Sequence, residues 1–87
     1  KYDKWERFEI LFTKVRPGFK ENIIKSYPTL TPGELRLASL LSMGLETKHI
    51  AELLNIQPDS VKKARQRLRA KLGMPSDMTF ITFFNNF

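Results

Sequence analysis

The sequence predicts an all-α fold, in which a bundle of three or four helices follows a pair of N-terminal helices. Apolar residues recur at three- and four-residue steps along the chain, proline or glycine stands at the ends of these stretches, and no stretch shows the alternation of a half-buried strand. A chain of 87 residues is long enough for one domain with a single modest core. We expect residues 1–29 to form the N-terminal helix pair, packed on a bundle made by residues 30–87.

The first two helices are predicted from apolar stripes that turn signals interrupt. A helix over about Tyr2–Val15 places large apolar residues on one side, namely Tyr2, Trp5, Phe8, Leu11, Phe12 and Val15. Pro17-Gly18 ends this helix. A shorter stripe follows and stops before Pro28, which disfavours helical geometry in the preceding residue; its members are Phe19, Ile23, Ile24 and Tyr27. We expect Trp5 to anchor the first helix in the core.

The third helix has the clearest start signal in the sequence. Thr31 can accept hydrogen bonds from free backbone N–H groups, Pro32 suits the first helical position, and Glu34 completes a capping box. The helix should run to about Met43, with Gly44 closing it in a positive-φ conformation. It is apolar nearly all round, so we expect neighbours on two sides. Glu34 lies on its apolar face and should form an ion pair, with Arg65 and Lys71 as candidate partners.

Three further helices are predicted in the remainder of the chain. One covers Thr47–Leu54, and after a tight connection Pro58 opens another that reaches Leu72 and ends at Gly73. A short last helix, capped by Ser76 or Asp77, should extend to about Asn85. Its aromatic residues share one face and are predicted to be core: Phe80, Phe83, Phe84 and Phe87.

Composition excludes several classes of site. The chain has no cysteine, a single histidine and four scattered glycines, which leaves no basis for a thiol nucleophile, a zinc module or a phosphate-binding glycine loop. No nucleophile stands beside a base and no carboxylates cluster. We therefore expect no enzymatic activity, no cofactor and no metal. His49 is expected to be an exposed helix residue.

Positive charge is concentrated in one helix. The whole chain carries +6, and Asp59 to Lys71 alone carry six basic residues and one acidic residue, a net +5. Such a local stripe is the electrostatic signature of a surface that meets phosphates.

The helix from Pro58 to Leu72 divides into an apolar side and a polar side. At 100° per residue, its core face consists of Val61, Ala64, Leu68 and Leu72. Lys62, Lys63 and Gln66 lie roughly opposite, in the first turns of the second helix of what reads as a helix-turn-helix. Lysine suits guanine O6/N7 and glutamine suits adenine N6/N7, which predicts that these three residues read bases in the DNA major groove. The basic residues further along are expected to contact phosphates: Arg67, Arg69 and Lys71.

The order and spacing of a set of residues resemble LuxR/GerE-type helix-turn-helix domains. They are Leu30-Thr31-Pro32, Glu34, Leu41, Gly44-Leu45, Lys48, Ile50-Ala51, Leu54, Ile56, Ser60-Val61-Lys62 and Lys71-Leu72-Gly73. These domains form the C-terminal DNA-binding part of many bacterial transcription regulators. The residues before Leu30 and the ending at Phe87 resemble a subgroup at the C-terminus of large sensor-regulators, including those of two-component signalling.

The resemblance implies a role for each matching position. Lys62, Lys63 and Gln66 match the family's base-reading positions, while Lys48 and Ser60 match positions that contact the DNA backbone. The last helix is a frequent dimer surface in the family, which here implies Met78 and Ile81. The implied partners are double-stranded DNA, a second copy of the chain when bound, and an upstream sensor or receiver domain of the same chain. The implied location is cytoplasmic and DNA-associated, with no membrane contact by this segment.

Three positions depart from the family's pattern. Glu46 stands where a Ser or Thr cap is usual, so we expect Thr47 to cap the fourth helix one residue late. Gln57 replaces the usual Ser cap of the recognition helix, and His49 replaces a common Glu.

Two other interpretations stay open at the level of the sequence. Region 4 of a sigma factor shares nearly the same helix-turn-helix pattern, although the aromatic helix pair before Leu30 fits it less well. A protein-interaction module could instead present the basic face to an acidic partner.

Overall fold

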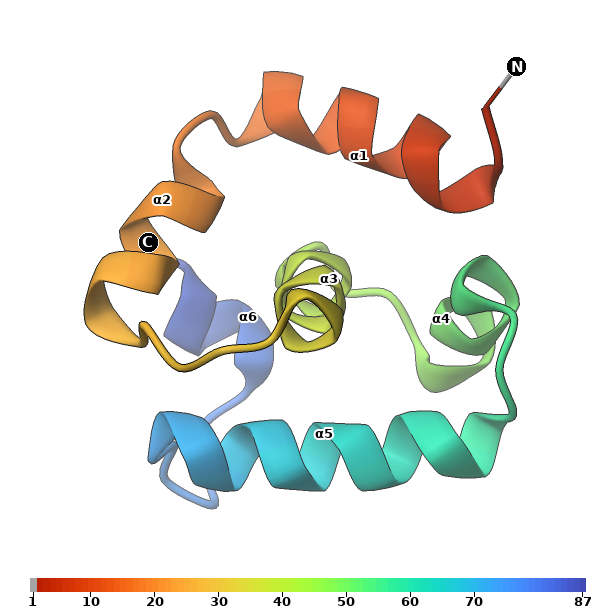
Figure 1. Cartoon of the computed structure of the whole chain (residues 1–87). Coiled ribbons are helices and arrows are strands. Elements are labelled where there is room, and N and C mark those ends of the chain that lie inside the picture. Colours follow the sequence, from red (N-terminus) through yellow and green to blue (C-terminus); the bar gives the residue numbers. More distant parts are fainter. Residues whose placement is uncertain (1) are drawn as a thin grey trace.

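A computed structural model describes residues 2–87 and shows six helices (Figure 1). Their bounds are α1 Lys4–Val15, α2 Phe19–Ser26, α3 Pro32–Ser42, α4 Thr47–Leu54, α5 Pro58–Leu72 and α6 Phe80–Phe84. The all-α prediction is confirmed, and the bounds of α4 and α5 agree with those predicted from the caps and breakers in the sequence.

The start of α1 differs from the prediction because a capping box precedes it. The helix begins at Lys4 rather than Tyr2, since the Glu6 backbone N–H donates to Asp3 Oδ1 at 2.8 Å. The Asp3 N–H in turn donates to Glu6 Oε1 at 3.2 Å. This reciprocal pattern satisfies backbone groups that the first turn cannot satisfy itself. The spacing of Asp3 and Glu6 could have predicted this helix start, but the apolar stripe alone was used to place it.

The inward face of α1 is narrower than predicted. Trp5 and Phe12 are buried, as expected, whereas Tyr2, Leu11 and Val15 are 58–63% exposed. Helix α1 lies across the outside of the molecule and is covered on one side only (Figure 1). Leu11 and Val15 therefore sit on its shoulder, about 60–100° around the helix from Phe12. The apolar side predicted for α1 is therefore buried only in part.

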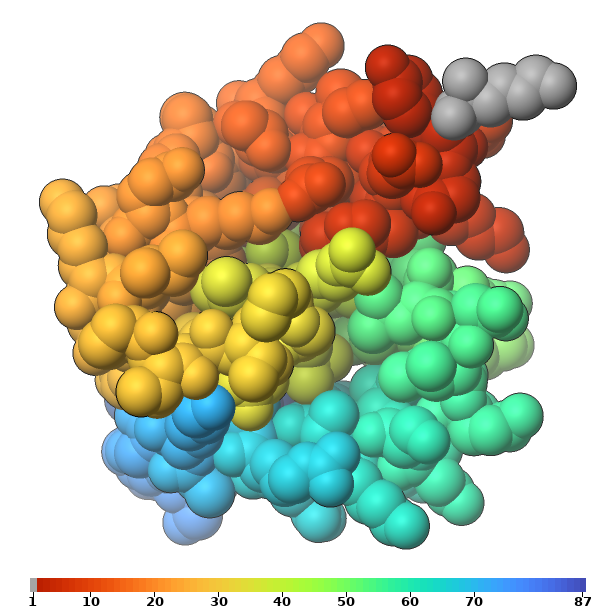
Figure 2. All heavy atoms as spheres, viewed as in Figure 1, coloured from red at the N-terminus to blue at the C-terminus, as the bar shows by residue number. Residues whose placement is uncertain are grey.

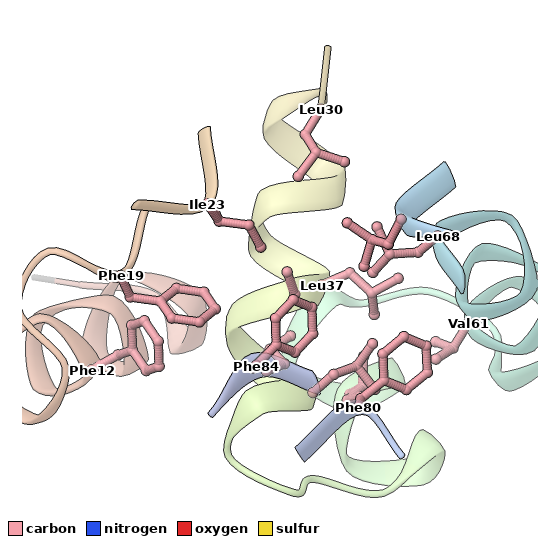
Figure 3. Close-up of a cluster of buried hydrophobic side chains, with 14 of the residues drawn as sticks. Phe12, Phe19, Ile23, Leu30, Leu37, Val61, Leu68, Phe80 and Phe84 are labelled. Carbon is pink, nitrogen blue, oxygen red and sulfur yellow. The ribbon is translucent and has the colours of Figure 1, made fainter. Parts of the chain in front are cut away.

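Helix α3 runs through the middle of the molecule. The N-terminal pair lies on one side of it and α5 on the other (Figure 1). Around α3, Phe12 and Phe19 approach from the N-terminal pair, while Val61 and Leu68 approach from α5 (Figure 3). The prediction that α3 is covered on two sides is confirmed, and the buried side chains form one continuous core.

The last helix begins later than predicted. Thr79, rather than Ser76 or Asp77, caps α6, because its hydroxyl accepts the Thr82 backbone N–H at 3.2 Å. Arg69 explains the delay: its guanidinium donates to the carbonyls of Pro75 and Met78, at 3.1 and 2.7 Å, and holds this segment as a turn. The predicted aromatic core is confirmed, with Phe80 and Phe84 buried and the other two aromatics of the stripe partly buried.

Glu34 joins the start of α3 to the end of α5. Its Oε1 accepts a hydrogen bond from Lys71 Nζ at 2.8 Å and one from the Thr31 backbone N–H at 2.8 Å. Of the two candidate partners predicted from the sequence, Lys71 forms the ion pair and Arg65 does not. Burial raises the pKa of the Glu34 carboxyl, but the hydrogen bonds and the charge of Lys71 outweigh burial, and the pKa lies below its usual value. The ionised carboxylate therefore contributes to stability.

We expect Glu34→Gln to lower the free energy of unfolding at pH 7 by about 0.5 kcal/mol, because it removes a partly exposed ion pair and keeps the capping geometry. Since the folded-state pKa is depressed, this contribution is present above the unfolded-state pKa of about 4.3 and is lost as the pH falls through the folded-state pKa. Denaturant unfolding at pH 7 and pH 3 measures it. The two proteins should differ at pH 7 and converge at pH 3; an equal gap at both would contradict the assignment.

Candidate nucleic-acid interface

Helices α4 and α5 are joined by a short turn that a left-handed residue makes possible. Asn55 closes α4 with φ 56° and ψ 48°, a conformation that asparagine tolerates better than most residues. The Ile56 N–H then donates back to the Ala51 carbonyl at 3.0 Å. Pro58 opens α5 at the first helical position, and Gln57 makes no side-chain cap, as its poor capping ability predicts. The result is the helix-turn-helix that the sequence predicts.

The core face of α5 fixes which side of the helix meets solvent. Val61 and Leu68 are fully buried and Leu72 is 3% exposed. Lys62, Lys63 and Gln66 are all exposed, and their side chains make no hydrogen bond or ion pair with residues 2–87.

Figure 2 shows the same arrangement at the level of atoms: α5, in cyan, lies at the surface along the lower edge of the molecule, on the side away from the N-terminal pair. The three predicted base readers therefore stand free on one outer face.

The predicted backbone contacts fall into two groups. Lys48, Ser60 and Arg67 are exposed and free of hydrogen bonds from their side chains to other described residues. Arg69 and Lys71 are engaged within the chain. Arg69 holds the turn before α6 and lies 4.7 Å from the centre of the Phe80 ring, while Lys71 Nζ donates to Glu34 and, at 2.9 Å, to the Thr29 carbonyl. Glu34 was a predicted partner of Lys71, but nothing in the sequence indicates that Lys71 also contacts the Thr29 carbonyl or that Arg69 contacts Phe80 and the turn before α6.

Arg65 is a member of the site that sequence reasoning did not identify. Its Nη1 donates to Thr47 Oγ1 at 2.8 Å, and its guanidinium lies 5.6 Å from the centre of the Phe80 ring. This contact corrects the expectation that Thr47 caps α4. Thr47 lies inside the helix, and the N-cap residue Glu46 makes no side-chain cap. In the sequence, Arg65 was considered only as a candidate partner of Glu34, and no local signal indicates its contact with Thr47.

Two adjoining hollows flank α5 on the side of α4 and α6. One, of about 540 Å³, is lined by residues that include Lys48 and Arg65, and the other, of about 320 Å³, by residues that include Lys62, Gln66 and Arg65. The two hollows form a concave strip beside the exposed face of α5, and its lining carries more basic than acidic side chains, with Glu46 as the acidic one. Since a duplex presents negatively charged phosphates along each edge of its groove, the strip has suitable charge for a sugar-phosphate backbone.

Of the remaining predicted positions, Ile81 lines the first hollow, whereas Met78 and His49 line neither. Ile81 on α6 is 47% exposed and Met78 is partly buried, with its carbonyl occupied by Arg69. His49 is exposed, as predicted. The described residues contain no group of three or more side chains that could hold a metal ion.

Comparison with known proteins decides the family. Residues 28–84 match the model of a family described as bacterial regulatory proteins, luxR family. The chain belongs to this family. A Mycobacterium tuberculosis protein, named as an HTH-type transcriptional regulator, is 33% identical over 64 residues, which cover 74% of this chain. The chain spans only 7% of the length of that relative. No solved structure gives a significant match.

Membership of the luxR family confirms the resemblance drawn from the sequence, and the helix-turn-helix is that of a family of bacterial regulatory proteins. The matched range begins two residues before Leu30, so the family match includes α3 to α6 and leaves α1 and α2 outside. Among residues 2–87, no helix has both the length and the apolar character needed to cross a membrane.

Proposed function

We propose that this luxR-family domain binds double-stranded DNA in a sequence-specific manner, with α5 in the major groove. The observation that carries the proposal is the two-sided character of α5. Its apolar side is anchored in the core, while Lys62, Lys63 and Gln66 are exposed and make no side-chain hydrogen bond or ion pair with the described residues. An α-helix fits the major groove, and long side chains in its N-terminal half reach base edges. The domain acts by binding, and we propose no catalytic role for it.

Contacts to the DNA backbone are assigned from side-chain availability. Lys48, Ser60 and Arg67 are free to bind phosphate oxygens. Arg69 and Lys71 could reach a phosphate only by giving up hydrogen bonds within the chain. We therefore propose that Lys48, Ser60 and Arg67 make the main phosphate contacts, and that Arg69 and Lys71 chiefly hold the end of α5.

The proposal is tested by selecting bound duplexes from a random library and titrating the selected duplex at several salt concentrations. Neutralising Z phosphates gives a slope of about −0.9Z in a plot of log K against log salt, and we expect Z of about 3–5 per monomer. An affinity that does not change with salt would contradict the proposal. A palindromic selected site would indicate a symmetric dimer.

Base reading is tested by single truncations in α5. We expect Lys62→Ala and Gln66→Ala to reduce discrimination between the selected duplex and single-base variants by about 1–3 kcal/mol, because each removes a base contact. Arg67→Ala is the control, since loss of a phosphate contact should weaken all duplexes alike. Equal weakening of every duplex by Lys62→Ala and Gln66→Ala would reject their assignment as base readers.

Assembly and control complete the proposal. We propose that the bound form is a homodimer formed through α6 and the turn before it, with exposed Ile81 and partly buried Met78 at the contact. An upstream sensor or receiver domain of the same chain would supply the signal, and the small share of the related regulator that this chain spans is consistent with a larger protein. The luxR-family match favours this interpretation over a sigma-factor region.

A further inference from the structure

Three side-chain hydrogen bonds join the N-terminal helix pair, including the residue Tyr27 that ends α2, to the C-terminal part of the chain. Arg16 Nη2 donates to the Phe84 carbonyl at 2.9 Å, and Asn22 Nδ2 donates to the main-chain oxygen of Phe87 at 3.2 Å. Tyr27 Oη donates to the Leu72 carbonyl at 3.0 Å. The first two bonds hold α6 and the residues after it, whereas the third reaches the recognition helix itself.

The Leu72 carbonyl belongs to the group of acceptors that a helix leaves unpaired at its C-terminus. Leu72 is the last residue of α5, and the N–H groups of Gly73 and Met74 bond to the carbonyls of Ala70 and Arg69 instead. Tyr27 therefore supplies a partner for an acceptor that the closing turn of α5 does not use.

Tyr27 is itself held by its backbone and by two aromatic neighbours. Its backbone N–H donates to the Ile23 carbonyl at 2.8 Å, and Pro28 prevents α2 from continuing. Its ring lies 6.3 Å, between centroids, from each of Phe83 and Phe87. The phenol hydroxyl at the end of α2 thus contacts the end of α5.

A second contact ties the same two segments together. Lys71, one residue before the end of α5, donates to the Thr29 carbonyl in the connector between α2 and α3 and to Glu34 at the start of α3. The connector that follows α2 therefore holds α5 at two successive residues, Lys71 and Leu72. The predicted base readers lie at the opposite end of α5. Within residues 2–87, no hydrogen bond or ion pair joins that end to the N-terminal pair.

We propose that Tyr27 is a positioning residue that sets the direction of the recognition helix, and that the N-terminal helix pair controls DNA reading through it. The inference rests on the proposed function of α5. Lys62 lies ten residues from Leu72, which is about 15 Å along a helix at 1.5 Å per residue. A tilt of about 10° at the held end would move Lys62 by roughly 2.6 Å, far more than the distance range of roughly 0.5 Å within which a hydrogen bond forms.

The test is Tyr27→Phe, which removes the hydroxyl and keeps the ring against Phe83 and Phe87. Tyr2→Phe is the matched control, because Tyr2 is 58% exposed and its hydroxyl makes no hydrogen bond with the described residues. We expect Tyr27→Phe to bind the selected duplex about fivefold more weakly and a scrambled duplex as the parent protein does, because phosphate contacts tolerate a shifted helix better than base contacts do. Tyr2→Phe should change neither affinity.

A second readout needs no DNA. Residual dipolar couplings of backbone N–H groups report the direction of each helix in the free protein. In Tyr27→Phe, the couplings of α5 should no longer fit the alignment that fits α1 to α4, whereas in Tyr2→Phe they should still fit.

The two readouts separate the failure of this inference from failure of the proposed function. Unchanged α5 couplings in Tyr27→Phe, or equal weakening on the selected and scrambled duplexes, would overturn the positioning role. If the parent protein binds no duplex, the proposed function fails, and the couplings alone decide whether Tyr27 orients α5.

Discussion

Reversing two charges on α5, with Lys62→Glu and Lys63→Glu in one variant, is expected to weaken binding to the selected duplex by at least 100-fold. Both side chains are exposed and make no hydrogen bond or ion pair within the described part of the chain, so the change should leave the fold intact. A base contact by one long polar side chain contributes about 1–3 kcal/mol, and each 1.4 kcal/mol corresponds to a factor of ten in affinity. Placing two carboxylates against the negatively charged duplex adds repulsion to the lost contacts. Fluorescence anisotropy with a labelled duplex measures the loss.

A matched variant separates position from overall charge. Lys4→Glu with Lys14→Glu changes two exposed lysines of α1 and also lowers the formal net charge from +6 to +2. We expect it to reduce affinity only modestly, because α1 lies across α3 from α5 (Figure 1). Equal losses in the two variants would show that net charge alone drives binding. Undiminished binding by the α5 variant would instead favour a protein-interaction module with a basic face.

The local signals in the sequence were sufficient for the elements that carry the proposed site. The bounds of α4 and α5 follow from residues that act on their own neighbours: Pro58 favours a helix start, and Gly73 adopts φ 67° to end the helix. The outward orientation of Lys62, Lys63 and Gln66 follows from helical periodicity once the apolar face is recognised. Such features depend on contacts within a few residues, which is why a single sequence reveals them.

The contacts that fix α5 in the fold depend on residues far apart in the chain. Nothing near Tyr27 in sequence indicates that its hydroxyl meets Leu72, and nothing near Arg69 indicates that it holds the turn before α6. The exposure of Leu11 has the same origin, because it depends on which neighbours cover α1 and not on the amphipathic pattern of α1. Periodicity predicts a face, but only the packed structure shows how wide that face is.

One core joins the N-terminal pair to the bundle, and Phe84 lies where they meet. It is fully buried, with its ring centroid 5.6 Å from that of Phe19 in α2 and 6.1 Å from that of Phe80 (Figure 3). Its carbonyl accepts the hydrogen bond from Arg16. Because the side chain touches both parts of the chain, a cavity there should weaken both.

We expect Phe84→Ala to lower the free energy of unfolding by about 3–5 kcal/mol, since it removes a large buried side chain and leaves a cavity. A domain of this length has a total stability of about 4–13 kcal/mol, so the variant should be close to its stability limit, with Tm lower by at least ~12 °C. Ile81→Ala is the control on the same helix; Ile81 is 47% exposed, and its loss should be below about 1 kcal/mol.

The same experiment tests whether residues 1–29 and 30–87 unfold together. Trp5 is the only tryptophan, so its fluorescence reports on α1, whereas far-ultraviolet circular dichroism reports on all helices. Because Phe12 and Phe19 share the core with Leu37 and Phe84, we expect the two probes to give coincident transitions in the parent protein, as two-state unfolding requires. A fluorescence transition that precedes the loss of helix would show that the N-terminal pair detaches first. In that case Phe84→Ala should increase the difference between the midpoints of the two transitions, because it removes the contact between the rings of Phe19 and Phe84.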